Sequence, residues 1–290
     1  MRILLTGGSG DLGQVLSKEL DIRGDIPVRL DVRAPLNNRG VFVQGSILDR
    51  PLLRQCLDGI DCIVHIAAWH GIHLVTKAKD VYDFWDLNVT GTFYVFEAAV
   101  EAGVQRIVYI SSESVNDWSG IYGHTKVLGE EIARTYAKRH GLQVLTLRPR
   151  AFIPYWNRAV YQSFIEWAKW FWPGAVHIDD VSQAVIQAID LLAHQSLSSM
   201  LVLNVDGAYE YSDEDLRAWD SNGPDTTFKK YYANYYDMVV RYGLNPAQKP
   251  SKLDISETCR WLGYEPHYSL KNLLMELERF GVEGPPPPAF

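Results

Sequence analysis

A tyrosine and a lysine four positions apart, Tyr122 and Lys126, are the residues of this sequence best suited to acid–base chemistry. Positions four apart lie on one face of a helix, so the Lys126 ammonium would lie beside the Tyr122 phenol and favour its ionised form. A phenol that ordinarily titrates near ~10 would then exchange a proton near neutral pH, as removing a proton from a substrate hydroxyl requires. The alternative is a chance spacing on an exposed helix.

The chain opens with an apolar segment that runs into a glycine-rich turn, Thr6 to Gly13. Gly7 would permit a tight turn, Gly10 would let the backbone approach a pyrophosphate, and Gly13 would let the following helix pack closely. The amino end of that helix would then face the phosphates. The alternative is a strand-to-helix turn that uses glycine for geometry alone.

Asp31 lies 18 positions after Gly13, at the end of the second expected strand. An acidic residue there hydrogen-bonds the adenosine ribose and repels a 2'-phosphate, so we predict NAD as the cofactor rather than NADP. Arg33, two positions on, could accommodate that phosphate and keeps NADP as the weaker alternative.

Residues 1–150 alternate short apolar runs with helical patterns, which predicts a parallel sheet with crossover helices. We expect strands at 3–6, 28–31, 41–44, 62–67, 107–111 and 144–148, and helices at 12–20, 52–57, 82–102 and 122–140. The predicted fold class is therefore α/β, a doubly wound parallel sheet (Rossmann fold) that binds NAD.

A small substrate lobe is expected beside this sheet. A helix at 179–194 and a strand at 200–205 should return to the sheet, so 176–206 belong with 1–150. The lobe itself should consist of 151–175 and 207–284, and it closes with a helix at 269–280 capped by Ser269. The proline-rich tail 285–290 is expected to be loose, since proline can neither donate to a ladder nor continue a helix.

Composition excludes several classes of partner. The chain has 290 residues, 47% of them hydrophobic, with a net charge of -7 and no basic run, which argues against nucleic acid or an anionic membrane. Three cysteines without metal-ligand spacing, two of them in apolar surroundings, indicate reduced thiols. With no apolar run of membrane length and no leader pattern, we predict a cytoplasmic protein.

Several motifs together resemble the extended branch of the short-chain dehydrogenase/reductase family, which contains the NAD-dependent epimerase/dehydratase group. The motifs span nearly the whole chain. They are the glycine turn, His65 to Ala68, Asn88 in Leu87 to Thr92, Ser111 to Val115, Tyr122 with Lys126, Leu147 to Pro149, Val176 to Val181, and Leu262 to Pro266.

The resemblance implies a role for each matched residue. Tyr122 would be the catalytic acid/base, Lys126 would lower its pKa and hold the nicotinamide ribose, and Ser112 would position the reacting oxygen, with Ser114 as the competing serine. Either serine could instead cap the strand end. The implied cofactor contacts are Gly7, Gly10, Asp11, Leu12, Gly13, Asp31, Ser46, Ile47, Ala67, Ala68, Asn88, Tyr122 and Lys126.

The chain departs from the family at three places that bear on ligands. Ser46 stands where relatives carry Asp, which puts the usual adenine contact in doubt and leaves Ile47 to supply it. Tyr122 follows Ser112 by only ten positions, and the stretch between Arg148 and Asp179 is short. Since these regions would hold a nucleotide handle, we expect a smaller substrate.

Aromatic residues gather between 152 and 172. Those at helical spacing, Phe164, Trp167, Trp170 and Phe171, are expected to pack in the core or against a partner. We expect substrate contacts from residues outside that stripe and from residues that follow the fourth strand. For the residues after the fourth strand, the alternative is a polar loop that binds no ligand. They are Trp69, His70, His73, Ser114, Arg150, Trp156 and Arg158. The two histidines lack a third ligand nearby, so no metal site is expected.

The prediction is an NAD-dependent oxidoreductase that transfers hydride between nicotinamide and a hydroxyl or carbonyl of a small sugar, sugar acid or polyol. The alternatives are a nucleotide-sugar epimerase or dehydratase with tightly bound NAD, and a dinucleotide-binding sensor without catalysis. By resemblance, the helices at 82–102 and 122–140 should pair in a homodimer.

Overall fold

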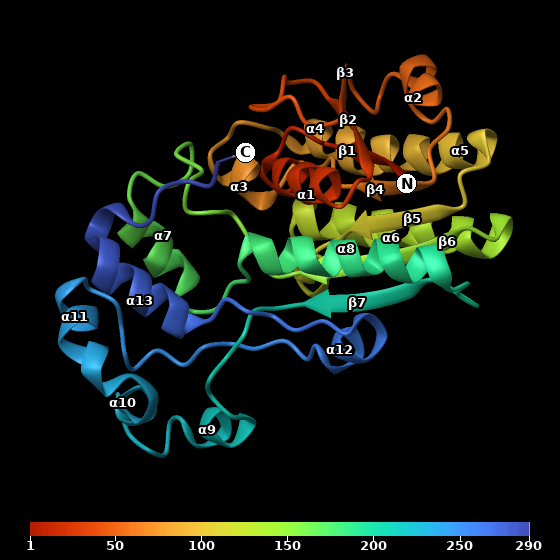
Figure 1. The fold of residues 1–290 in the computed structure, drawn as a ribbon. Helices are drawn as coiled ribbons and strands as arrows, with labels where there is room; N and C mark the ends of the chain where they lie inside the picture. Colours follow the sequence, from red (N-terminus) through yellow and green to blue (C-terminus); the bar gives the residue numbers. More distant parts are fainter. Residues whose placement is uncertain (290) are drawn as a thin grey trace.

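The computed structural model describes residues 1–289 and has the predicted α/β fold, built on a sheet of seven parallel strands (Figure 1). The order is β3-β2-β1-β4-β5-β6-β7, so the chain winds outward from β1 in both directions, as predicted. The bounds are β1 Arg2–Thr6, β2 Ile26–Asp31, β3 Val41–Gln44, β4 Cys62–His65, β5 Arg106–Ile110, β6 Gln143–Pro149 and β7 Leu201–Val205.

Helices cover both faces of the sheet, and the small lobe adds short helices beside it (Figure 1). Those of the first part are α1 Asp11–Ile22, α2 Arg50–Cys56, α3 Gly71–Val75, α4 Val81–Phe84, α5 Thr92–Ala102, α6 Ile121–His140 and α8 Ile178–His194. Those of the small lobe are α7 Phe164–Phe171, α9 Asp213–Ala218, α10 Thr226–Tyr232, α11 Tyr236–Arg241 and α13 Leu270–Phe280. Helix α12 Ser256–Leu262, expected in the lobe, packs instead on β7 and α8, with Trp261 and Leu262 against the core of the sheet.

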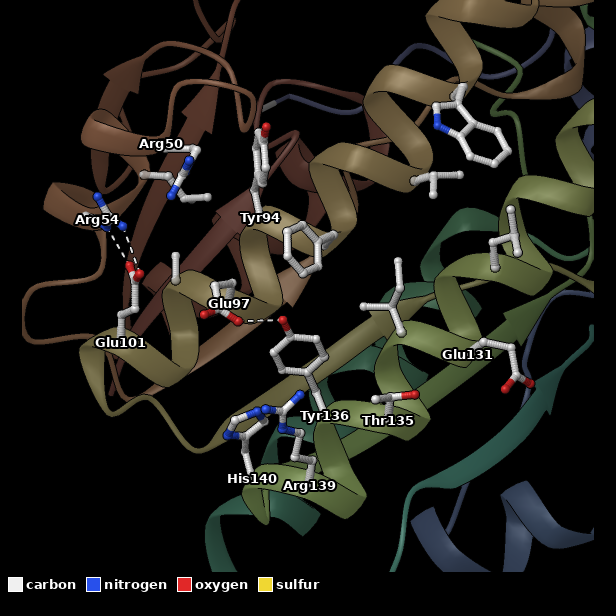
Figure 2. Close-up of a pocket in the computed structure, with 17 residues that line it drawn as sticks. Arg50, Arg54, Tyr94, Glu97, Glu101, Glu131, Thr135, Tyr136, Arg139 and His140 are labelled. Atoms are coloured by element: carbon white, nitrogen blue, oxygen red, sulfur yellow. Dashed lines mark hydrogen bonds and ion pairs between the residues drawn. The ribbon is translucent and has the colours of Figure 1, made fainter.

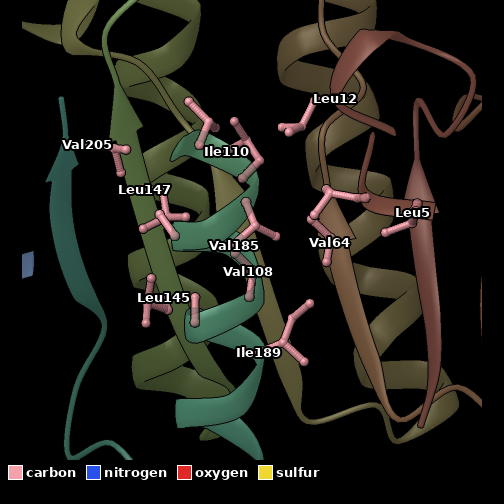
Figure 3. Close-up of a cluster of buried hydrophobic side chains, with 14 of the residues drawn as sticks. Leu5, Leu12, Val64, Val108, Ile110, Leu145, Leu147, Val185, Ile189 and Val205 are labelled. Atoms are coloured by element: carbon pink, nitrogen blue, oxygen red, sulfur yellow. The ribbon is translucent and has the colours of Figure 1, made fainter. Parts of the chain in front are cut away.

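The sheet is buried on both faces, which explains why its strands read as continuous apolar runs. On one face α1 and α8 pack against side chains such as Leu5, Val64 and Leu147 (Figure 3). On the other face α2, α5 and α6 pack against Leu4, Ile63 and their neighbours. Because the strands are parallel, their carboxyl ends meet at one edge of the sheet.

The expected helix at 82–102 is instead divided into α4, a π-helical turn η1 (Trp85–Gly91) and α5. Hydrogen bonds of Asn88 accompany the irregular turn. The Asn88 amide bonds to the backbone of Trp69, and the Thr92 hydroxyl donates to the Asn88 carbonyl at 2.6 Å. Such turns inside helices often mark functional sites.

The small lobe has its own aromatic core, as the helical stripe predicts. Phe164 and Trp167 of α7 are fully buried and pack with Phe171, Phe228 and residues of α13. Trp170 is half-buried against the same cluster. The stripe therefore packs the lobe, and Ser269 caps α13 as predicted, accepting from the Lys271 N–H at 3.2 Å.

Residues 285–289 of the tail differ from expectation because they are held to the protein rather than loose, while Phe290 lies outside the described residues. The Tyr155 hydroxyl donates to the Pro286 carbonyl at 2.9 Å, and the Lys18 ammonium donates to the Ala289 carbonyl at 2.6 Å. Proline lacks an N–H but keeps its carbonyl, so side-chain donors can fasten a segment that no ladder could hold.

Replacing Trp167 by Ala should destabilise the small lobe, because Trp167 is 1% exposed and its loss leaves a cavity. We expect the free energy of unfolding to fall by about 3–5 kcal/mol in urea titrations. Trp170→Ala, on the same helix but half-buried, is the matched control and should cost clearly less. Equal losses for the two variants would contradict the assignment of Trp167 to the core.

Candidate active site

Helix α6 and the end of β5 bring the predicted catalytic residues together at the carboxyl ends of β4 and β5. Tyr122 and Lys126 lie one turn apart on α6, with the Lys126 nitrogen 5.9 Å from the centre of the Tyr122 ring. Ser112 follows β5 and is a hydrogen-bond partner of the Tyr122 phenol. Ser114 contacts Ser112, with 3.1 Å between the two hydroxyl oxygens. Ser112 thus adjoins the phenol.

Lys126 is buried behind the phenol. Its ammonium donates to the Ile110 carbonyl at 2.8 Å and lies over the Tyr109 ring. Burial lowers the pKa of Lys126 to about 7, against a smaller upward effect of the Glu130 charge. The ammonium therefore exchanges its proton near neutral pH.

The direction of the Tyr122 shift differs from expectation. Burial raises the pKa of Tyr122 to about 12, and the hydrogen bond with Ser112 opposes this only in part. The expected lowering by Lys126 is not found, because the ammonium donates to the backbone of β5 and desolvation of the phenol dominates. In this structure the phenol is a neutral acid.

Asn88 holds the loop after β4 against α6. Its side chain accepts from the Trp69 N–H at 2.7 Å, and donates to the Trp69 carbonyl at 3.0 Å and to the Thr125 hydroxyl at 3.1 Å. Thr125 in turn donates to the Tyr122 carbonyl at 2.9 Å. Asn88 therefore links the β4 edge to the helix of the reactive tyrosine.

A buried histidine that the motif analysis gave no role, His65, connects the same parts. Its Nδ1 lies 2.7 Å from the Thr6 hydroxyl and its Nε2 lies 3.0 Å from the Thr92 hydroxyl. Thr92 already donates to Asn88, so Nε2 must carry the proton and Nδ1 must accept from Thr6. Burial lowers the pKa of His65 to about 3, so the ring stays neutral.

Glu130 is a second buried residue that no motif singled out. It lies one turn after Lys126 and accepts from the Ser111 hydroxyl at 2.6 Å. Arg148, at the end of β6, donates to it from Nε at 2.8 Å and from Nη2 at 2.5 Å. The spacing from Lys126 was the available sequence signal, since it places Glu130 on the same helical face.

The glycine turn fits a dinucleotide pyrophosphate. Gly7 has φ +69°, and a Cβ there would lie 3.0 Å from the Ala67 Cα, so the turn passes close to the β4 edge. A Cβ at Gly13 would lie 2.6 Å from the Gly8 Cα. Helix α1 begins without a side-chain cap, and the buried Ser9 hydroxyl has no partner within 1–289. Unpaired donors at a helix start suit a phosphate.

The remaining cofactor candidates lie around this turn. Asp31 ends β2 and accepts from the Ser9 and Arg33 N–H groups, each at 3.0 Å, which leaves further lone pairs on both oxygens for ribose hydroxyls. Ser46 accepts from the Leu48 N–H at 3.1 Å and so caps its own turn. Ile47 is buried beneath η1. Leu12 is buried in α1, while Ala67 and Ala68 follow β4.

The two histidines after β4 have different surroundings. His73 accepts from the His70 N–H at 3.0 Å, so it caps α3, which fits the simple polar loop. The His70 ring lies 6.2 Å from the Tyr122 ring. The His70 side chain is exposed. The Trp69 ring contacts His73 and the Lys79 ammonium.

The Arg150 guanidinium is bound by groups of the protein, and its expected contact with substrate stays a prediction. It is 7% exposed, lies 3.5 Å from the Asp206 carboxylate, and donates to the Ser251 hydroxyl and carbonyl. Arg150 thus ties the sheet to the C-terminal lobe. Trp156 lies half-buried where two core clusters meet, and the exposed Arg158 donates to the Gln162 carbonyl at 3.0 Å. Substrate contact by these two stays a prediction.

Two searches over the described chain returned nothing. Within residues 1–289, the His, Cys, Asp and Glu side chains form no group of three or more that could hold a metal ion. None of the helices in that part of the chain is both long and apolar enough to cross a membrane.

Comparison with known proteins identifies the family. The model of the NAD dependent epimerase/dehydratase family matches residues 3–165, more than half of the chain. The chain therefore belongs to this family, as its motifs predicted, and the prediction of NAD is confirmed at the level of the family.

Three relatives cover different shares of the chain. An uncharacterized protein, y4nG, of Sinorhizobium fredii is 28% identical over 94% of this chain and 76% of its own length. An L-arabinose 1-dehydrogenase (NAD(P)(+)) of Haloferax volcanii is 28% identical over 51% of this chain. A uronate dehydrogenase of Pseudomonas putida is 26% identical over 53%. The last two alignments span only 65% and 62% of those enzymes.

Solved structures share the fold over nearly the whole chain. A UDP-glucuronic acid 4-epimerase from Bacillus cereus, in complex with UDP-glucuronic acid and NAD, has a TM-score of 0.69 and 21% identity over 95% of this chain and 97% of its own. A short-chain dehydrogenase/reductase superfamily protein from Agrobacterium tumefaciens with bound NAD has a TM-score of 0.71 and 17% identity, covering 95% of each chain. At these identities the likeness establishes the fold alone.

Replacing Lys126 by Met should change how stability depends on pH. The pKa of Lys126 falls from 10.5 to about 7 on folding, so between these values the unfolded chain binds one more proton than the folded chain. The stability of the wild type should therefore rise with pH relative to Lys126→Met, by up to ~1.4 kcal/mol per pH unit, in urea titrations between pH 7 and pH 10.

Lys138→Met is the control, because Lys138 is an exposed lysine of the same helix. Its stability difference from the wild type should be independent of pH over this range. A pH-independent difference for Lys126→Met as well would contradict the lowered pKa.

Proposed function

We propose that this chain is an NAD-dependent oxidoreductase that acts on a hydroxyl or carbonyl of a small sugar, sugar acid or polyol. The observation that carries the proposal is the convergence of Ser112, Tyr122 and Lys126 at the carboxyl ends of β4 and β5. Beside them lies the glycine turn, after which helix α1 begins without a side-chain cap. Ligands of doubly wound sheets bind at this edge.

Each residue of the set has a role that its surroundings support. The neutral Tyr122 phenol must first ionise, which the positive charge of an oxidised nicotinamide beside it would favour. It then accepts the proton of the substrate hydroxyl, while Ser112 donates to the reacting oxygen and Lys126 holds the nicotinamide ribose. NAD, when bound, supplies the hydride acceptor. In the oxidative direction a secondary alcohol gives a carbonyl, NADH and one proton, so atoms and electrons balance.

The cofactor contacts follow the turn and the neighbouring strand ends. The N–H groups of Asp11 and Leu12 and the Ser9 hydroxyl face the pyrophosphate, and Asp31 binds the adenosine ribose. His70, exposed beside Tyr122, is the side chain of the β4 loop that we assign to the substrate.

Two observations favour a substrate without a nucleotide. The connection between Ser112 and Tyr122 is short, with one 3-10 turn, Glu113–Asp117, between them. Two of the relatives reported above are named as dehydrogenases of L-arabinose and of uronate. A nucleotide-sugar epimerase or dehydratase is the second candidate, because the epimerase from Bacillus cereus shares the fold over almost its whole length. A sensor without catalysis would not require the tyrosine, lysine and serine together.

Tyr122→Phe should abolish turnover and leave NADH binding within about twofold, because it removes the proton acceptor and little else. A panel of aldoses, uronates, polyols and UDP-sugars with NAD is followed at 340 nm. Net NADH formation from an unconjugated sugar supports the proposal. Epimerised UDP-sugar without net NADH supports the second candidate, and wild-type turnover by Tyr122→Phe would refute the mechanism.

We also propose a homodimer through the helices at 82–102 and 122–140. A hollow of about 750 Å³ runs over α2, η1, α5 and α6 (Figure 2). Its exposed apolar residues include Trp85 and Phe93, and its rim carries both acidic and basic side chains, among them Glu97, Glu101 and Arg139. A face with both charges can pair with its own copy across a two-fold axis.

Phe93→Glu should shift the protein to monomer in sedimentation equilibrium at micromolar concentration, because it places a charge in the centre of the proposed apolar contact. Ile22→Glu changes a more exposed apolar residue, on α1, and should leave the dimer intact. A monomeric wild type under these conditions would reject the dimer.

A further inference from the structure

The loop after β6 reaches back onto the glycine turn. The Asn157 side chain donates from Nδ2 to Asp11 Oδ2 at 2.8 Å, and its Oδ1 accepts from the Ala159 N–H at 3.2 Å. The second bond holds the amide in its orientation, with the nitrogen toward Asp11. Asp11 is the first residue of α1, so the contact lies at the helix end that fits the pyrophosphate.

An aspartate such as Asp11 is unusual at a phosphate site, because its negative carboxylate would lie beside the negative pyrophosphate. It lies in a buried setting where desolvation raises its pKa, while the bond from Asn157 and the charge of Arg33 act in the opposite direction. The Asn157 amide is thus the neutral donor that stabilises this carboxylate, and Arg33 is the cation that faces it.

The chain end fastens the same loop from the other side. Tyr155 donates to the Pro286 carbonyl at 2.9 Å, and Lys18, on α1, donates to the Ala289 carbonyl at 2.6 Å. A Cβ at Gly284 would lie 2.3 Å from the Phe164 ring, so the tail leaves the small lobe in tight contact with α7. In Figure 1 the C-terminal end lies beside α1.

We propose that loop 154–161 and the chain end 285–289 form a closure over the phosphate side of the dinucleotide site, with Asn157 as a positioning residue that acts through Asp11. Bound NADH then leaves only after these contacts open, so the closure sets the rate of cofactor release. This inference rests on the dinucleotide binding proposed above. It assigns retention of the cofactor to two segments, loop 154–161 and the chain end 285–289, that lie outside the sheet and bind to α1.

The test measures NADH release by stopped-flow fluorescence, with excess NAD to displace the NADH. Asn157→Ala should release NADH about tenfold faster than the wild type, which corresponds to about 1.4 kcal/mol in the barrier to release. Asn222→Ala removes the same group from an exposed turn of the small lobe and should leave the rate within twofold.

A second variant tests the chain end without deleting it. Lys18→Met should also accelerate release several-fold, whereas Lys271→Met, an exposed lysine of α13, should not. If Asn157 acts through Asp11, adding Asn157→Ala to Asp11→Ala should produce no further acceleration. Independent, additive effects would overturn the role of Asn157 as a positioning residue.

The outcomes separate the closure from the function on which it rests. Normal NADH binding with release unchanged in both Asn157→Ala and Lys18→Met would overturn the closure alone. If these two variants lowered the free energy of unfolding but left the rate of NADH release unchanged, the closure would also be overturned, because the contacts would then only stabilise the fold. A wild type that binds no NADH would overturn the closure and the proposed function together.

Discussion

Burial of two ionisable side chains on one face of α6 is the constraint on which the site depends. Removing Lys126 and Tyr122 from water disfavours the charged form of each, so the ammonium titrates near neutrality while the phenol stays protonated. The Ile110 carbonyl and the nearby carboxylate of Glu130 compensate the buried ammonium. Ionisation of the phenol therefore requires added positive charge, and the oxidised nicotinamide ring carries such a charge.

The polar groups behind the site form a network whose proton positions are determined. In this network Thr6 donates to His65, His65 donates to Thr92, and Thr92 donates to the Asn88 carbonyl. The Asn88 amide donates in turn to the Trp69 carbonyl, and every bond joins a different pair of elements. A neutral histidine suits this place because it donates and accepts at once without bringing an unpaired charge into the core. The π-helical turn that carries Asn88 is part of the same arrangement.

The second lobe is joined to the sheet through charged and polar contacts rather than through the aromatic core alone. Arg150 and Asp206 are both buried and bind each other where β6 and β7 end. Breaking such a pair would leave an uncompensated buried charge, so the pair specifies how the lobe meets the sheet. The lobe thereby keeps a defined position at the ends of β6 and β7.

Sequence alone determined the doubly wound sheet, the glycine turn, the pairing of Tyr122 with Lys126, and the aromatic stripe of α7, because each follows from local spacing along one strand or helix. Only the tertiary structure decided the sign of the Tyr122 shift, the position of Lys126 against Ile110, the enclosure of Arg150 and the fastening of the tail. These depend on desolvation and on partners distant in the chain, and neither quantity is encoded in the spacing of neighbouring residues.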